Sequence, residues 1–144
     1  MKLALASDHG GFHLKKALLK FLDSRQIGVV DLGTTSEDSV DYPDYAAQVA
    51  RQVAEGKVDG GVLVCGTGIG MAITANKFKG VRAAVVSDPY TAQMSKEHNN
   101  ANVICIPARF VTVEEAEEFV NVFLNSSFEG GRHQKRVEKI ELAG

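Results

Sequence analysis

Short apolar runs alternate with amphipathic segments along the whole chain, and this alternation constrains the fold more than any other feature. The runs lack the polar alternation of a half-exposed strand, which predicts a parallel sheet covered by helices on both faces. Strands are expected at residues 2–6, 27–32, 61–65, 81–86 and 103–106. Helices are expected at residues 12–22, 42–55, 90–98 and 113–124, with a shorter one running from a turn at 66–70 to residue 76. The predicted fold class is therefore α/β.

Composition narrows the class of protein. The 144 residues are 44% hydrophobic and 24% charged, the balance of one globular domain over residues 1–144. A net charge of -2 argues against the basic surface of a non-specific nucleic-acid binder. We expect no membrane span and no signal peptide, because no apolar stretch approaches about 20 residues and the apolar start falls short of roughly 7–15. Cys65 and Cys105 have neither CxxC nor zinc spacing, so a reduced cytoplasmic protein is expected.

The most informative motif is a glycine-rich turn at residues 65–71, Cys-Gly-Thr-Gly-Ile-Gly-Met. Glycine at three alternate positions lets backbone N–H groups approach an oxygen-rich ligand, and the helix that follows adds positive potential. Met71 stands where the dinucleotide fingerprint GxGxxG requires glycine, so a nicotinamide cofactor is not expected. A tight strand-to-helix turn without any ligand is the alternative interpretation.

The edge of the sheet at which strands end is the expected place for a ligand, because open α/β sheets bind ligands beyond the carboxyl ends of their strands. That rule nominates residues 8–9, 65–70 and 87–88. Cys65 ends a strand there, where a helix N-terminus favours the reactive thiolate of a cysteine. A small core residue is the alternative for Cys65, and it is the interpretation that we prefer for Cys105 inside its apolar run.

Histidine and asparagine residues supply further candidates. His98 and Asn99 close the fourth predicted helix, which we also place at the ligand-binding edge, and a histidine there can transfer protons near neutral pH. A helix-terminal cation with an asparagine cap is the simpler explanation of this pair taken alone. Cysteine, histidine and asparagine together also fit a thiol hydrolase. His9 and His13 lack an acidic third ligand, so no metal site is expected.

A basic tail follows the last predicted helix. Residues 129–136 begin with two glycines after Glu129 and then become basic. Arg132 and Arg136 lie four residues apart and share one face if the tail is helical. Two guanidinium groups on one face match phosphate oxygens, although a solvated basic face is the commoner meaning of such a cluster.

Taken together, these segments resemble the ribose-5-phosphate isomerase B family, whose sugar-phosphate isomerases include the galactose-6-phosphate isomerase subunits. The resemblance spans nearly the whole chain, in order, through residues 7–11, 41–46, 65–70 with 75–77, 95–102 and 129–136. Each stretch alone is a weak signal, but five in register are strong. One branch of the family has a glutamate in the turn; Met71 takes that position here, and the presence of Cys65 is similar to the cysteine branch.

The resemblance implies a Rossmann-like three-layer αβα sandwich with a five-stranded parallel sheet and a basic helical tail. It implies a dimer or tetramer that uses no metal or coenzyme, binds a phosphorylated sugar, and has no nucleic-acid or membrane partner. His98, Asn99 and Arg109 would reach the site from the neighbouring subunit.

The resemblance also implies a role for each site residue. Cys65 would move a proton between C1 and C2 of the open-chain sugar, and His98 would help to open the furanose ring. The enediolate oxygens would be held by the amides of Gly66, Thr67, Gly68, Ile69 and Gly70, with Thr67 near for oxygen proton transfers. Sugar hydroxyls would be bound by Asp8, His9, Tyr42 and Asn99. The phosphate would be bound by Arg109, Arg132 and Arg136.

The implied activity is the interconversion of ribose 5-phosphate and ribulose 5-phosphate. The same chemistry on a six-carbon aldose phosphate, such as allose or galactose 6-phosphate, is the nearest alternative. A non-catalytic sensor of sugar phosphates or nucleotides is an alternative of another class, although binding alone does not need the thiol of Cys65.

Overall fold

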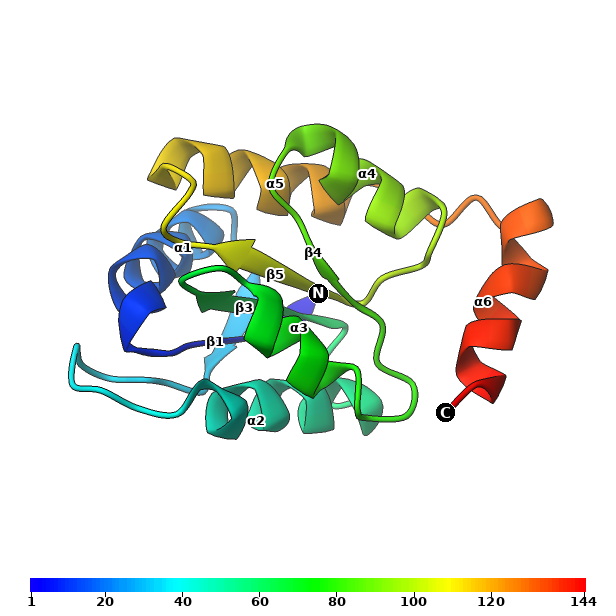
Figure 1. Cartoon of the computed structure of the whole chain (residues 1–144). Helices are drawn as coiled ribbons and strands as arrows, with labels where there is room; N and C mark the ends of the chain where they lie inside the picture. The colour runs from blue at the N-terminus through cyan, green and yellow to red at the C-terminus, as the bar shows by residue number, and fades with distance from the viewer.

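The computed structural model describes residues 1–144 as a five-stranded, all-parallel sheet between two layers of helices, with one further helix to the side (Figure 1). The strand order is β2-β1-β3-β5-β4. The strands are β1 (Lys2–Ser7), β2 (Gly28–Asp31), β3 (Gly60–Cys65), β4 (Ala83–Val85) and β5 (Val103–Pro107). The helices are α1 (Phe12–Ser24), α2 (Tyr42–Ala54), α3 (Ile69–Ala75), α4 (Pro89–Glu97), α5 (Val113–Asn125) and α6 (Arg132–Leu142), with a short 3₁₀ turn η1 (His9–Gly11). The predicted α/β sandwich is confirmed.

Successive side chains of the central strands divide between two cores, because they point to opposite faces of the sheet. In β1, Leu3 and Leu5 enter the core beneath α1, α4 and α5, whereas Ala4 and Ala6 enter the core beneath α2 and α3. The strand β3 is buried along its whole length. Helices therefore cover both faces, as the unbroken apolar runs predict.

The ends of the elements differ slightly from the predicted ones. The strand β4 is three residues long rather than the six expected at 81–86, and α3 ends at Ala75. The acidic first turn of α5 forms a capping box, in which Thr112 and Glu115 each accept a hydrogen bond from the other's backbone N–H. Asp88 caps α4 by accepting from the N–H of Thr91 at 2.7 Å.

The two edges of the sheet carry different parts of the chain. Each of the helices α1 to α4 returns from the carboxyl end of one strand to the amino end of the next, so the C-termini of these helices gather at the amino edge. The amides of Asn102 and Val103, which follow α4, donate to Arg82 O just before β4. The carboxyl edge, with Cys65, is about 13 Å away along β3, from a rise of roughly 3.3 Å per residue.

The helix α6 stands at the amino-edge side of the molecule, apart from the sandwich (Figure 1). Glu129 in the preceding segment donates its N–H to Glu97 O at 3.0 Å. Near the far end of α6, Glu141 pairs with Arg82 at 2.5 Å. The predicted helical tail is thus confirmed. None of the helices combines the length and the apolarity that crossing a membrane requires.

Candidate active site

Cys65 lies at the carboxyl end of β3 with only 5% of its surface exposed. Its Sγ accepts a hydrogen bond from the N–H of Gly68 at 3.2 Å, inside the turn that leads to α3. Gly68 has a φ of +76°, which a residue with a side chain rarely adopts, so glycine is favoured at this position of the turn. A donated N–H is a favourable partner for a thiolate, so the turn suits Cys65 as a base.

The glycines of this turn are covered by two side chains from other elements. A Cβ at Gly66 would lie 3.0 Å from Nε of Arg109, and a Cβ at Gly70 would collide with the ring of Tyr42. Backbone hydrogen bonds hold the Arg109 segment there, because Ala108 N–H donates to Cys65 O and Arg109 N–H donates to Gly66 O. Glycine is therefore required for close approach, and Arg109 and Tyr42 stand beside the Cys65 turn.

Asp8 and His9 follow β1 at the same edge. The Asp8 carboxylate accepts the N–H of Gly11 at 3.0 Å and so fixes the turn η1. Nδ1 of His9 accepts the N–H of Val40 at 3.1 Å. In the neutral ring the proton is then on Nε2, which is left free to donate to a ligand. A third side chain at this edge, the hydroxyl of Thr67, accepts the N–H of Ile69 at 3.3 Å.

His98 and Asn99 do not lie at this edge, and here the sequence-based expectation is wrong. They follow the C-terminus of α4, and Asn99 lines a cavity together with residues 80–84 at the start of β4. The error has a simple reason: a helix that follows a strand begins at the carboxyl edge, so its last residues must lie at the amino edge.

The phosphate candidates are also divided between the edges. Arg109 was expected from a neighbouring subunit, but its own chain already places it on Gly66. Arg132 and Arg136 lie on α6, both exposed, while His133 and Val137 form the buried stripe of that helix. One chain therefore holds Arg109 near Cys65, and it holds the other two arginines near His98.

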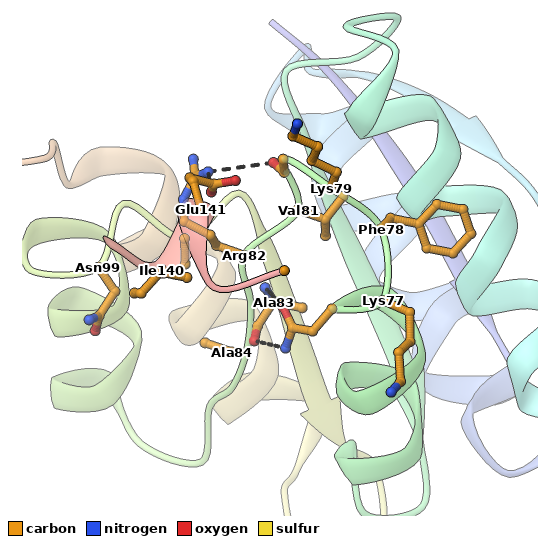
Figure 2. Close-up of a pocket in the computed structure, with 14 residues that line it drawn as sticks. Lys77, Phe78, Lys79, Val81, Arg82, Ala83, Ala84, Asn99, Ile140 and Glu141 are labelled. Atoms are coloured by element: carbon orange, nitrogen blue, oxygen red, sulfur yellow. Dashed lines mark hydrogen bonds and ion pairs between the residues drawn. The ribbon is translucent and has the colours of Figure 1, made fainter. Parts of the chain in front are cut away.

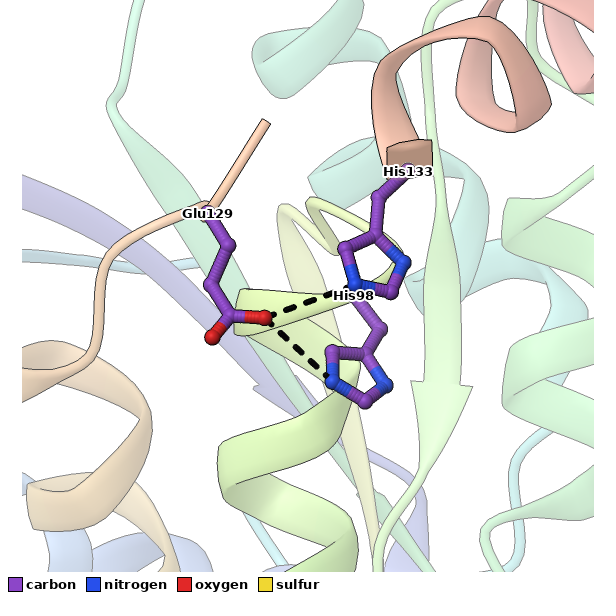
Figure 3. Close-up of side chains that lie close together, drawn as sticks. All are labelled: His98, Glu129 and His133. Atoms are coloured by element: carbon purple, nitrogen blue, oxygen red, sulfur yellow. Dashed lines mark ion pairs between the residues drawn. The ribbon is translucent and has the colours of Figure 1, made fainter. Parts of the chain in front are cut away.

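His98 belongs to a side-chain cluster that sequence reasoning missed. Its ring stacks on His133 with centroids 4.2 Å apart and planes 14° apart. Nε2 of each histidine lies 3.4 Å from Oε1 of Glu129 (Figure 3). Burial, helped by the charges of His98, Arg132 and Arg136, lowers the pKa of His133 against the opposing effect of Glu129. The only local signal is the spacing of Glu129 and His133, which lie four residues apart across the start of α6.

The comparisons with known proteins agree on one family. The sequence model of the Ribose/Galactose Isomerase family matches residues 3–140. Ribose-5-phosphate isomerase B of Escherichia coli is 51% identical over 139 residues, 96% of this chain and 93% of the relative. The chain belongs to the ribose/galactose isomerase family.

Solved structures of related isomerases share the fold at similar identity. A ribose 5-phosphate isomerase from Thermotoga maritima is 45% identical with a TM-score of 0.96, covering 98% of this chain and 97% of the other. Ribose-5-phosphate isomerase B from Mycoplasma genitalium, solved with bound ribulose-5-phosphate, is 46% identical with a TM-score of 0.95 over 99% and 95% of the two chains.

A cavity of about 420 Å³ in this family member is not lined by Cys65. Figure 2 shows the side chains that line it. It opens between the segment from Asn76 to Ala84 and the end of α6, where Ile140 and Glu141 face the sandwich. Its lining includes Asn99 but no residue of the turn at 65–70. This cavity therefore does not coincide with the edge that carries Cys65.

Two groups of side chains were considered as metal ligands. His98, Glu129 and His133 offer donor atoms within 4.8 Å of one another. In the structure both Nε2 atoms face the Glu129 carboxylate at 3.4 Å. His9 and His13 are engaged separately, with the amide of Val40 and with the carboxylate of Glu37.

The two cysteines have different surroundings. Burial, with a smaller contribution from the neighbouring Cys65, raises the pKa of Cys105 far above the ordinary value of a thiol. Cys105 is completely buried in the middle of β5. This confirms that it is a core residue and leaves Cys65 as the cysteine beside the turn.

Proposed function

We propose that this chain is an aldose–ketose isomerase that interconverts ribose 5-phosphate and ribulose 5-phosphate. The observation that carries the proposal is the sulfur of Cys65, held by the Gly68 amide at the edge where the turn amides, Asp8, His9 and Arg109 also lie. Family membership supports it, and so does the ribulose-5-phosphate bound by the relative from Mycoplasma genitalium.

Cys65 acts on the open-chain sugar. Its thiolate takes the proton from the carbon next to the carbonyl, and the C–H electron pair forms the enediolate while negative charge moves to oxygen. The thiol then returns the proton to the other carbon, and Thr67 assists transfer between the two oxygens. Backbone N–H groups of residues 66–70 stabilise the charge because they are fixed before the reaction begins. The proton balance closes within the site, so the reaction needs no redox cofactor.

His98 opens the furanose ring before this step. The imidazole of His98 takes the proton from the anomeric hydroxyl of the sugar. It gives a proton to the oxygen of the furanose ring as the C1–O4 bond breaks. Asp8, His9, Tyr42 and Asn99 bind hydroxyl groups. Arg109, Arg132 and Arg136 bind the phosphate, whose binding energy positions the distant reacting carbons.

Two copies of the chain complete each site. Within one chain, His98, Asn99, Arg132 and Arg136 lie at the amino edge, more than about 13 Å along the sheet from Cys65. A sugar phosphate of five carbons cannot reach from one edge to the other. We therefore assign those residues to the neighbouring subunit of a dimer, which can pair further into a tetramer, and assign Arg109 to the subunit that supplies Cys65.

A panel of aldose phosphates tests the function. Ribose 5-phosphate, allose 6-phosphate and galactose 6-phosphate are each incubated with the protein, and kcat/KM is compared. We expect ribose 5-phosphate to be preferred. A clear preference for a six-carbon sugar would contradict the proposed substrate. Binding of all three sugar phosphates without turnover would contradict the proposed enzyme activity and indicate a sensor. Cys65→Ala is the matched control for contaminating activity.

A further inference from the structure

We infer that Glu129 and His133 position His98 for ring opening and couple it to the phosphate-binding helix α6. The inference rests on the proposed function and adds two residues to it. Neither touches the reacting atoms: both act through the His98 ring.

The stacking geometry supports this role first. His133 is 6% exposed, and its ring lies flat against the half-buried ring of His98 with centroids 4.2 Å apart. Nε2 of His133 is buried without a hydrogen-bond partner of good geometry. A buried, unpaired ring nitrogen is costly for stability, so packing alone does not account for a histidine at this position. A phenylalanine would stack there without that cost.

The position of Glu129 also supports the role. Its Oε1 faces Nε2 of both histidines at 3.4 Å (Figure 3). A carboxylate favours the ring form that carries a proton on the facing nitrogen. In neutral His98 that form leaves Nδ1 as the acceptor, the nitrogen that points away from Glu129. Nδ1 can then take the anomeric proton and return it to the ring oxygen.

His133 also connects His98 to α6. His133 lies between Arg132 and Arg136 in the register of one helix, with the arginines exposed and His133 turned inward. A phosphate held by the two arginines fixes the helix that carries His133, and His133 in turn fixes the plane of His98. Burial is the main cause that lowers the pKa of His133, with a contribution from the charges of Arg132 and Arg136.

Ribulose 5-phosphate distinguishes a role of Glu129 and His133 in ring opening from a structural role. Its phosphate blocks the hydroxyl that would close a five-membered sugar ring, so this substrate is always open-chain. Exchange of its C1 hydrogen with heavy water requires Cys65 but no ring opening. We expect His133→Ala and Glu129→Gln to lower kcat for ribose 5-phosphate by at least about 10-fold, a part of what a general acid–base contributes. C1 exchange should stay within about twofold of wild type, as should KM.

Two control variants show whether a loss of activity is specific to the His133 ring. Gln134→Ala changes an exposed neighbour on α6 and should leave both rates unchanged, while His133→Phe keeps the stack and shows whether the nitrogen matters. Isomerisation at the wild-type rate in His133→Ala and Glu129→Gln would overturn the inference, and so would a parallel loss of exchange and isomerisation. A wild-type protein that neither isomerises ribose 5-phosphate nor exchanges C1 hydrogen would instead overturn the proposed function.

Discussion

The two edges of the sheet hold their functional side chains by different means. At the carboxyl edge, backbone hydrogen bonds and glycine-dependent close packing fix Cys65, Arg109 and Tyr42 around one turn. At the amino edge, a stack of two imidazoles and one pair between Arg82 and Glu141 attach α6 to the sandwich. The carbon base therefore sits in a rigid frame, whereas His98 at the end of α4 stacks on a helix, α6, that is less firmly attached and that carries the proposed phosphate-binding arginines.

The largest effect should come from the rigid edge. Cys65→Ser is nearly isosteric, but a hydroxyl is far less acidic than a thiol, so interconversion should fall by about 10³-fold or more. The fold, the oligomer and binding of a phosphate-bearing inhibitor should be retained. NMR in heavy water measures deuterium placed on the carbon that receives the proton. Near-normal incorporation by folded Cys65→Ser would remove the thiolate from the mechanism.

A complementation experiment tests whether the edges of two chains meet. Cys65→Ala and His98→Ala are each expected to be inactive, since each lacks one half of every site. Random re-pairing should restore about a quarter of wild-type activity, because half of the dimers are mixed and each mixed dimer has one intact site. Subunit exchange is verified by native mass spectrometry with a labelled chain. No recovery despite complete exchange would contradict a shared site.

The arginines of α6 should show a smaller effect. Arg132→Ala or Arg136→Ala should reduce kcat/KM for ribose 5-phosphate by about 10–100-fold, since a charge-assisted contact contributes roughly 1.5–3 kcal/mol. The slow reaction of unphosphorylated ribose should hardly change. Lys135→Ala, an exposed neighbour of like charge, serves as the control. Equal losses on ribose and its phosphate would show that α6 has only a structural role.

The smallest effect concerns the attachment of α6. Because the pKa of docked His133 is lowered, the undocked helix takes up a proton more readily, and docking should weaken as the pH falls below the ordinary value of 6.5. Amide hydrogen exchange of α6, corrected for intrinsic rates, should show less protection at about pH 5.5 than at about pH 7.5. His133→Phe should abolish the difference, and β3 amides provide an internal reference. Unchanged protection of α6 would exclude the effect.

Local patterns in the sequence predicted much of the fold and one half of the site. The buried runs of β1, β3 and β5 were evident because a strand covered on both faces needs apolar side chains at every position. Cys65 and its glycines could be placed at the carboxyl edge because they directly follow such a run. The helical tail follows the family resemblance, and the spacing of Arg132 and Arg136 then places both on one face of that helix.

The other half of the site depends on contacts between distant segments. His98 meets Glu129 and His133 only because α6 returns to the C-terminus of α4, across more than thirty residues of chain that carry no local signal of the contact. Arg109 reaches Gly66 through the pairing of β3 with β5, which sets Cys65 opposite Pro107. By itself, the sequence determined the elements, the two-faced burial of the sheet and the position of Cys65, because these follow from local periodicity. Only the tertiary structure decided which edge each remaining group occupies, because a helix reverses direction between strands and α6 docks through contacts between segments far apart in the sequence.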